Sequence, residues 1–367
     1  MKVVDDQYDR LSELKAFDET KSGVKGLVDA GVTKVPRIFI NENDKPPKLM
    51  NPATFRNSDE LISIPIIDIS GINDSAATRA QIVKKVKDAS EQLGTFQIIN
   101  HELPLSIMDE MIEGVRRFHE QDTEVKKQYY TRDMTRKFQY NSNLNIFNLP
   151  TASWKDNFLG RMVPNPPHSH DLPDVCRDIM FEYTEHVTKV GNTVYELLSE
   201  ALGLKPSHFK ENGCVDAVAI VGNYYPTCPQ PELTFGAGKH IDYALLTILL
   251  QDKTGGLQVL CQDQWVDVPV VSGGLIINVG DFIQLISNDK FKSIWHRVLA
   301  KKESSRISVA TFLSPGQTND ITMYGPIKEL ITENEPAIYK ATTFKDFVTY
   351  YFTQTVDRTA ELTHFKL

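Results

Sequence analysis

The chain has 367 residues, and its hydrophobic fraction of 41% is enough to build a large buried core. The formal net charge of −8 at pH 7 disfavours nucleic acid and anionic membrane surfaces as partners, and no apolar run approaches the length of a membrane span. The four cysteines form no CxxC pair and the acidic N-terminus lacks an apolar signal core, so we expect a cytoplasmic protein with reduced thiols, and we expect it to be a monomer.

Helices dominate the predicted structure of the first half. They are expected at residues 75–93, 105–130 and 175–202. In the first of them Ile82 and Val86 follow helical spacing, and Gly94 suits the position just after a helix end. Between the helices, residues 138–158 contain several asparagines and Trp154, and we predict strands and loops near the entrance of a pocket.

From residue 216 the pattern changes to short apolar runs separated by Gly, Pro, Asn and Asp, which is typical of a sandwich or barrel. The expected strands are 217–221, 245–250, 257–260, 265–268, 275–279, 295–300 and 306–313. Aromatic residues at helical spacing in 344–352 predict a C-terminal helix that closes over a pocket or simply packs on the barrel. The predicted divisions are a mainly helical region at 1–215, a β region at 216–315 and a C-terminal helical extension at 316–367.

His240, Asp242 and His296 are the residue types of an open metal site. In an extended strand residues i and i+2 point to the same face, so His240 and Asp242 can bind one ion. If His296 supplies a third ligand, the set is the facial triad of two histidines and one carboxylate that holds iron(II) and leaves positions open. A structural zinc site would instead be closed by four protein ligands.

Arg306 and Ser308 share one face of a predicted apolar strand. Because a buried arginine is unfavourable unless an anion meets it, two interpretations stay open. One is a salt bridge with a carboxylate of this chain; the other is a small dicarboxylate held by the guanidinium group, with the Ser308 hydroxyl as an added donor. Asn223 and Tyr225 also share a face at the end of a predicted strand, so both can donate to the same ligand oxygens.

The ordered set Asn223-Tyr224-Tyr225-Pro226, His240-x-Asp242, His296 and Arg306-x-Ser308 resembles that of the plant iron(II)- and 2-oxoglutarate-dependent dioxygenases. Segments 64–69, 96–101 and 288–293 also resemble this family. The N-terminal segments 14–21 and 23–29 are similar to a narrower group within it, the homologues of aminocyclopropanecarboxylate oxidase.

The resemblance implies an α+β fold with a double-stranded β-helix, or jelly-roll, core flanked by N-terminal helices and a C-terminal helix. It assigns iron(II) to His240, Asp242 and His296, and 2-oxoglutarate to Arg306, Ser308, Tyr225 and Asn223. It also implies molecular oxygen and a small-molecule substrate as reactants, ascorbate as reductant, and succinate and carbon dioxide as products.

The leading functional hypothesis is hydroxylation of a small, largely apolar plant metabolite, with an alkaloid as an expectation taken from relatives in the family. The alternatives are an ascorbate-dependent aminocyclopropanecarboxylate oxidase and a non-catalytic jelly roll that binds a metabolite. Candidate pocket residues are Phe312, Tyr140 and Phe147. Strand alternation predicts that Trp295 points away from the metal into the core, and Glu102 stands where family members commonly carry glycine.

Overall fold

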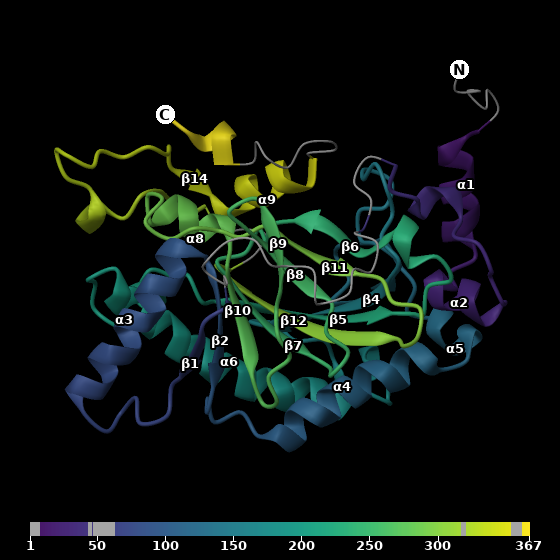
Figure 1. Ribbon diagram of the computed structural model, residues 1–367, viewed down its shortest axis with the longest axis horizontal. Coiled ribbons are helices and arrows are strands. Elements are labelled where there is room, and N and C mark those ends of the chain that lie inside the picture. The colour runs from purple at the N-terminus through teal and green to yellow at the C-terminus, as the bar shows by residue number, and fades with distance from the viewer. Residues whose placement is uncertain (1–7, 43–45, 47–62, 317–320, 354–361) are drawn as a thin grey trace.

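The structure is a computed structural model that describes residues 8–42, 46, 63–316, 321–353 and 362–367. The expected absence of a signal sequence concerns residues 1–6, which lie outside the described residues. Two β-sheets lie one above the other, and helices cover the outer face of the larger sheet (Figure 1). Apolar side chains from both sheets, among them Leu249, Val259 and Ala310, form one buried cluster. The molecule is therefore an α+β protein.

The major sheet has eight strands, in the spatial order β1 Ile66–Asp68, β2 Thr95–Ile99, β10 Leu275–Val279, β7 Leu246–Gln251, β12 Arg306–Ser314, β5 Ala217–Tyr225, β4 Asp156–Val163 and β3 Phe138–Asn141. The minor sheet contains β6 Phe235–His240, β11 His296–Leu299, β8 Leu257–Cys261 and β9 Gln264–Asp267, and a separate ribbon pairs β13 Met323–Tyr324 with β14 Thr342–Thr343. Among the paired strands of the described residues, only β1 and β2 run parallel to each other. The two facing sheets form the expected double-stranded β-helix.

The major sheet extends across the division that the sequence suggested between residues 215 and 216. Strands β1 to β4 all precede residue 216, and β4 pairs with β5 along most of its length. The edge strand β3 then pairs with β4, and its Tyr140 forms an isolated parallel bridge with Tyr130. Residues 66–163 thus supply four of the eight strands of the major sheet, in addition to helices that pack on it.

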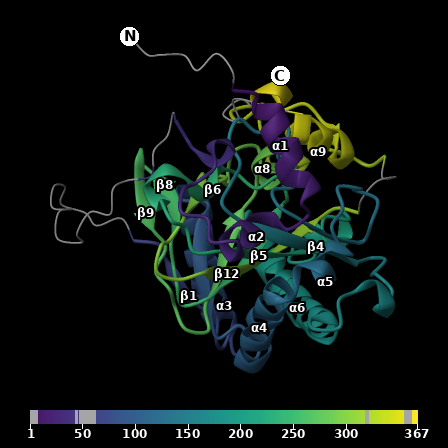
Figure 2. The same ribbon diagram turned by 90° about the vertical axis from the view of Figure 1, so that its right-hand side faces the viewer.

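The helices of the described chain are α1 Arg10–Glu19, α2 Gly23–Asp29, α3 Ala76–Gln92, α4 Leu105–Glu120, α5 Thr123–Lys127, α6 Arg177–Ala201, α7 His208–Glu211, α8 Asp281–Ile286 and α9 Phe344–Thr353. Helices α3, α4 and α6 form the outer layer against the major sheet, whereas α1 and α2 lie at its β4 side (Figure 2). The single helix expected at 105–130 is broken, because Gln121 adopts an extended conformation and the Asp122 carboxylate accepts a hydrogen bond from the Glu124 N–H, which starts α5.

The N-terminal helices are anchored by one buried carboxylate and one aromatic cluster. Asp156, at the start of β4, accepts hydrogen bonds from the backbone N–H groups of Val24 at 2.8 Å and Lys25 at 2.7 Å. Burial raises the pKa of this carboxyl group to about 6. Nearby, the rings of Phe39 and Trp154 meet edge to face at 5.2 Å. The N-terminal helices are thereby fixed to the strand that runs along the cavity described below.

Three smaller observations bear on the expectations from sequence. All four cysteines are free and buried. Within the described residues, no helix is both long enough and apolar enough to cross a lipid bilayer. Glu102 has a φ of +64°, in the left-handed region that favours glycine, so the residue that departs from the family pattern occupies a backbone position suited to the glycine.

Candidate active site

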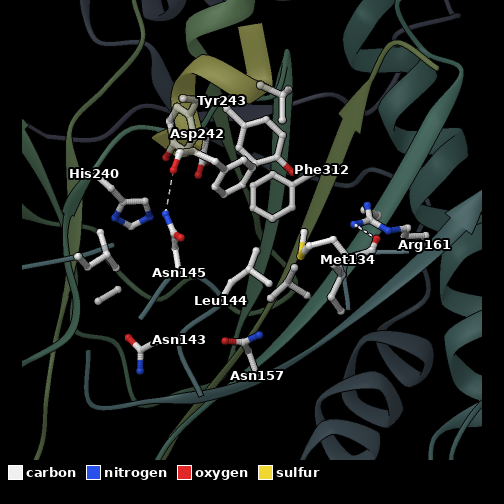
Figure 3. Close-up of a pocket in the computed structure, with 18 of the residues that line it drawn as sticks. Met134, Asn143, Leu144, Asn145, Asn157, Arg161, His240, Asp242, Tyr243 and Phe312 are labelled. Atoms are coloured by element: carbon white, nitrogen blue, oxygen red, sulfur yellow. Dashed lines mark hydrogen bonds between the residues drawn. The ribbon is translucent and has the colours of Figure 1, made fainter. Parts of the chain in front are cut away.

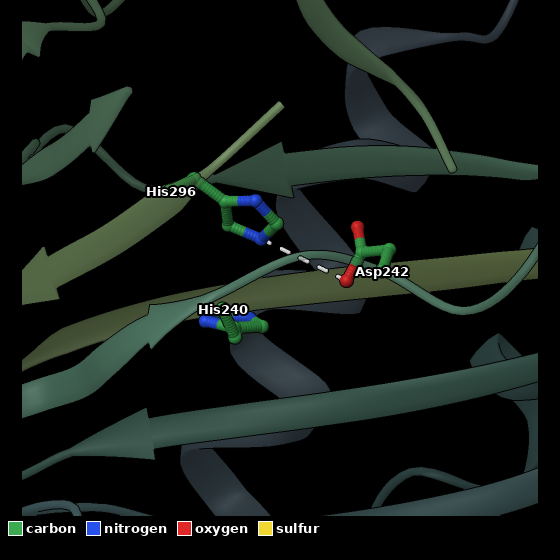
Figure 4. Close-up of side chains that lie close together, drawn as sticks. All are labelled: His240, Asp242 and His296. Carbon is green, nitrogen blue, oxygen red and sulfur yellow. Dashed lines mark ion pairs between the residues drawn. The ribbon is translucent and has the colours of Figure 1, made fainter. Parts of the chain in front are cut away.

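The side chains of His240, Asp242 and His296 converge at one end of the two sheets (Figure 4). Their nearest ligand atoms all lie within 4.8 Å of one another, so a single ion could contact all three. His296 Nε2 and Asp242 Oδ1 are 3.7 Å apart, and the two imidazole ring centroids are 4.1 Å apart. Asp242 and His296 are buried, while His240 is half-buried and faces a cavity.

Strand register brings the two histidines together. His240 is the last residue of β6 and His296 the first of β11, and the two residues are directly paired across the minor sheet. Asp242 lies just beyond the end of β6, where its carbonyl oxygen accepts a hydrogen bond from the Asp281 N–H at 2.9 Å. Gly280 permits this approach, because a Cβ atom there would lie only 1.9 Å from the Ala244 carbonyl oxygen.

Backbone carbonyl groups determine which nitrogen each histidine offers to a metal. Nδ1 of His240 is 2.7 Å from the Gly238 carbonyl oxygen, and Nδ1 of His296 is 3.1 Å from that of Ile294. Since a carbonyl oxygen can only accept a hydrogen bond, the neutral rings carry their hydrogen on Nδ1 and present the lone pair of Nε2. This is the tautomer that a metal ligand requires.

The donor set fits a divalent cation. The Nε2 lone pair of His296 faces a carboxylate oxygen of Asp242, and two such acceptors repel each other unless a cation lies between them. The second oxygen, Asp242 Oδ2, is buried and has no hydrogen-bond partner among the described residues. Two imidazoles and one carboxylate are the ligands of an open, catalytic iron(II) site.

Arg306 is almost completely buried, with an exposed fraction of 1%, on the strand next to β5. Its Nε donates to the Gly255 carbonyl oxygen at 2.8 Å and its Nη1 to Ser308 Oγ at 3.0 Å, while the Tyr225 ring lies 5.0 Å from its Cζ. Its Nη2 donates to the amide oxygen of Gln251. Within the described part of the chain no carboxylate is within ion-pairing distance, so the salt-bridge interpretation has no support there.

The residues predicted to assist Arg306 lie on the neighbouring strand. Tyr225 is the register partner of Arg306, and Asn223 is the partner of Ser308. Asn223 is also close to a further cation, because its Oδ1 accepts a hydrogen bond from Lys155 Nζ at 3.0 Å. The four predicted residues therefore form one buried polar group on adjacent strands.

A cavity of about 1200 Å³ opens in front of His240 and Asp242 (Figure 3). Its aromatic wall includes Tyr243 and Phe312, whose rings stack at 5.7 Å. Helix α9 lines one side of the cavity, which favours the first of its two interpretations, and Tyr351 donates from Oη to the Ile241 carbonyl oxygen at 2.7 Å. The volume is large enough for a cosubstrate together with an organic molecule.

Phe312 lines this cavity, whereas Tyr140 and Phe147 do not, which corrects the prediction for these two residues. Tyr140 is fully buried on the helix-covered side of β3, where its ring meets Phe118 of α4 at 5.3 Å. Phe147 is 41% exposed and lies 5.5 Å from the guanidinium carbon of Arg132. The prediction placed both residues in loops before the β region, whereas Tyr140 lies in β3, with its side chain on the face that meets α4.

Trp295 was also misplaced by alternation. It lines the cavity instead of packing in the core, with Lys239 Nζ 4.4 Å above its ring. The physical reason is that β11 begins only at His296, so the period of two does not apply to the preceding residue. Cavity residues that sequence reasoning missed include Tyr243, Lys155 directly before β4, and Arg161 on β4. The alternation of residues 155–163 was the signal that could have revealed the last two.

Comparisons with known proteins agree with this geometry. A family model described as the 2OG-Fe(II) oxygenase superfamily matches residues 218–315, and one described as the N-terminal region of non-haem dioxygenases in morphine synthesis matches residues 64–174. Deacetoxyvindoline 4-hydroxylase of Catharanthus roseus is 50% identical over 98% of this chain and 90% of its own length. The 1-aminocyclopropane-1-carboxylate oxidase homolog 1 of Arabidopsis thaliana is 48% identical over 98% of this chain and 97% of its own length.

Among solved structures, a similar one is the crystal structure of JOX2 in complex with 2OG, Fe and JA. Its TM-score is 0.80 and its sequence identity 28%, and the match covers 94% of this chain and 97% of that chain. The crystal structure of a rice dioxygenase for auxin oxidation matches with a TM-score of 0.71 at 22% identity, covering 83% of this chain and all of that chain. The second likeness concerns the fold alone.

Proposed function

The chain belongs to the 2-oxoglutarate- and iron(II)-dependent oxygenase superfamily, and from this membership we propose that it hydroxylates a small organic molecule bound in the cavity beside His240 and Asp242. It is a non-haem dioxygenase whose cofactor is iron(II), whose cosubstrate is 2-oxoglutarate and whose usual reductant in the family is ascorbate. The observation that carries the proposal is the convergence of His240, Asp242 and His296, two of which line one large cavity.

We assign the metal to Nε2 of His240 and His296 and to the carboxylate of Asp242. The Gly238 and Ile294 carbonyl oxygens hold both rings in the required tautomer. When bound, iron(II) and 2-oxoglutarate supply oxidation by molecular oxygen, with release of succinate and carbon dioxide. The residues of the chain bind and orient the reactants and exclude water.

We assign the distal carboxylate of 2-oxoglutarate to Arg306 and Ser308, assisted by Tyr225 and Asn223. The guanidinium group is already oriented by Gly255 and by Ser308, so little reorganisation is needed when an anion arrives. A buried guanidinium without a carboxylate partner in the described chain is the kind of site that a dicarboxylate stabilises.

The organic substrate is expected to have an apolar body, which the stacked rings of Tyr243 and Phe312 can contact. The names of similar proteins point to different molecules: one relative is a deacetoxyvindoline hydroxylase, which motivated the alkaloid expectation, and a structural neighbour was solved with JA. A cavity of about 1200 Å³ is far larger than the small amino acid used by aminocyclopropanecarboxylate oxidase needs. The converging ligand lone pairs likewise favour an enzyme over a binding protein without a metal.

Anaerobic titration of the iron(II)-loaded protein with 2-oxoglutarate tests the assignment. We expect the weak visible charge-transfer band of a keto acid chelated to iron(II), and we expect the Asp242→Ala variant to lose it. Failure to see the band in protein shown to contain stoichiometric iron would contradict the 2-oxoglutarate assignment. Ascorbate-dependent oxidation would then be the favoured hypothesis.

A further inference from the structure

The charge of the cavity lining is opposite to that of the whole chain. The protein carries 48 acidic and 40 basic residues, excluding histidine. Among the described residues that line the cavity, however, the only acid is Asp242, which is assigned to iron. The lining cations are Lys137, Lys155, Arg161, Lys239 and Lys345. A bound metal ion would add further positive charge, so the potential in this cavity favours anions.

Two of these cations are carried by β4 and by the residue directly before it. Residues 155, 157, 159, 161 and 163 all line the cavity, as the period of two requires. Lys155 lies at the first of these positions and Arg161 at the fourth, with Asn157 and Leu159 between them. In the described part of the chain Lys155 Nζ meets only neutral groups, the amide oxygen of Asn223 at 3.0 Å and the Tyr225 ring at 6.0 Å.

Arg161 is placed at the far end of the cavity from the metal ligands. Figure 3 shows His240 on one side, Arg161 on the other, and the rings of Tyr243 and Phe312 between them. The pairing of β4 with β5 is irregular between Arg161 and Val163, and such irregularities commonly re-aim a side chain beside an active site. The register partner of Arg161 is the small residue Ala219, and Nη2 of Arg161 donates to the Met134 carbonyl oxygen at 3.3 Å.

We propose that the substrate is an amphipathic organic anion, a small molecule with an apolar body and a carboxylate group that Arg161 receives. This inference rests on the proposed function, because it concerns the substrate of the same site. The apolar body lies against Tyr243 and Phe312, and the opposite end of the molecule reaches His240 and Asp242, where oxidation takes place. Arginine suits this role because its planar fork binds a carboxylate through two hydrogen bonds. Protonated amines, including basic alkaloids, are disfavoured.

Three probes with the same ring system and different charge test the proposal. They are 2-naphthylacetate, 2-naphthylacetamide and 2-(2-naphthyl)ethylamine, which are an anion, a neutral molecule and a cation at neutral pH. Calorimetric titration of the metal-free full-length protein should show that the acid binds roughly tenfold or more tightly than the amide, with the amine weakest. Equal binding of acid and amide, or preference for the amine, overturns the proposal.

Variants then locate the charge that selects the anion. Arg161→Gln should reduce the affinity for the acid to about that for the amide, and Arg161→Glu should make the amine the preferred probe. Lys345→Gln is the matched control, because it removes one positive charge from an exposed lining position on α9. If Lys345→Gln weakens the acid as much as Arg161→Gln does, the preference comes from the general field and the assignment to Arg161 is wrong.

Failure of this inference can be distinguished from failure of the proposed function. The probes bind without metal, whereas the charge-transfer band requires iron and 2-oxoglutarate. If the wild-type protein forms the band but binds acid and amide equally, only the inference about an anionic substrate is contradicted. If it never forms the band, the proposed function is contradicted whatever the probes show. The band in the Arg161→Gln variant, with its melting temperature, verifies that the variant is folded with an intact metal site.

Discussion

The two ends of the cavity are built in different ways. At the metal end, register pairs His240 with His296, and each ring is held by a backbone carbonyl group two residues earlier. At the other end, Arg161 is a long side chain at an irregular point of β4. The difference suggests that the reaction is determined by backbone geometry, whereas the choice of substrate depends on side chains that can change without disturbing the sheets.

The largest effect is expected where the backbone fixes a ligand. The His296→Ala variant should lose more than about 99% of 2-oxoglutarate turnover, since even residues that only orient a metal ligand are worth 10- to 100-fold. Metal content and succinate release measure the loss, and circular dichroism should show that the fold is kept. Full activity in this variant would contradict the metal assignment, and the contrast between a metal end and a substrate end of the cavity would then no longer hold.

Arg306 tests whether the buried anion site belongs to the metal end. In Arg306→Ala the affinity for 2-oxoglutarate should fall by roughly 100-fold, because a charged hydrogen-bonded pair is lost from a dry site. Arg306→Lys keeps the charge without the fork and should lose less. Titration of both iron-loaded variants with 2-oxoglutarate measures this, while naphthylacetate binding serves as the control. A variant that loses naphthylacetate but keeps 2-oxoglutarate would reverse the assignment of the two ends.

A third prediction concerns the helix-covered face of the major sheet, outside both ends. His119 is fully buried between the rings of Phe158 and Tyr224, and burial, reinforced by Lys126, lowers its pKa from 6.5 to about 3. Below pH 6.5 the unfolded chain therefore binds a proton at this histidine, whereas the folded chain does not. The free energy of unfolding consequently decreases as pH falls from 6.5 towards 3, with a limiting slope of about 1.4 kcal/mol per pH unit.

The His119→Phe variant keeps the aromatic packing and should remove that slope. The raised pKa of Asp156 acts in the opposite direction between about pH 6 and pH 4, so variant and wild type must be compared at each pH. Urea unfolding at pH 7, 6 and 5 gives the difference in unfolding free energy. We expect this difference to shift towards the variant as pH falls, and a constant difference would exclude the role of His119. Oxygenase activity at pH 7 should change little.

The smallest effect is expected at the closing helix. Tyr351→Phe removes the hydrogen bond from Oη to the Ile241 carbonyl oxygen, which is worth roughly 1 kcal/mol. Naphthylacetate affinity should fall by less than about tenfold, while 2-oxoglutarate affinity stays the same. Faster amide hydrogen exchange in α9 would verify the cause. An equal loss of both ligands would mean that α9 stabilises the whole cavity and not its substrate end alone.

The parts that sequence predicted well are those that depend on short-range pattern. The strand containing Arg306 and Ser308, and the pairing of Asn223 and Tyr225 on one face, follow from alternation and were found at the expected positions. The three metal-ligand candidates also converge, although β6 ends at His240 and Asp242 lies in the following segment. Their roles as ligands stay predictions until the metal is measured.

The errors arose where long-range pairing decides the outcome. The pairing of β4 with β5 brings β4, and β3 beside it, into the major sheet. Because β5 lies after residue 216, residues 138–163 alone do not reveal this pairing. The face on which Tyr140 lies could therefore not be derived from residues 138–158 alone. Alternation puts Arg161 on the same face as Asn157 and Leu159, but the pairing of β4 with β5 decides that this face meets the cavity.

Lys155 and Asp156, at the point where β4 begins, limit how this strand can shift against β5. Lys155 faces the cavity and its neighbour Asp156 faces away, holding the N-terminal helix α2. A one-residue slip of β4 against β5 would exchange the two faces, turning a carboxylate towards the cavity and a lysine towards backbone N–H groups. The register that pairs Asp156 with Tyr224 therefore fixes both the charge of the cavity lining and the attachment of α2.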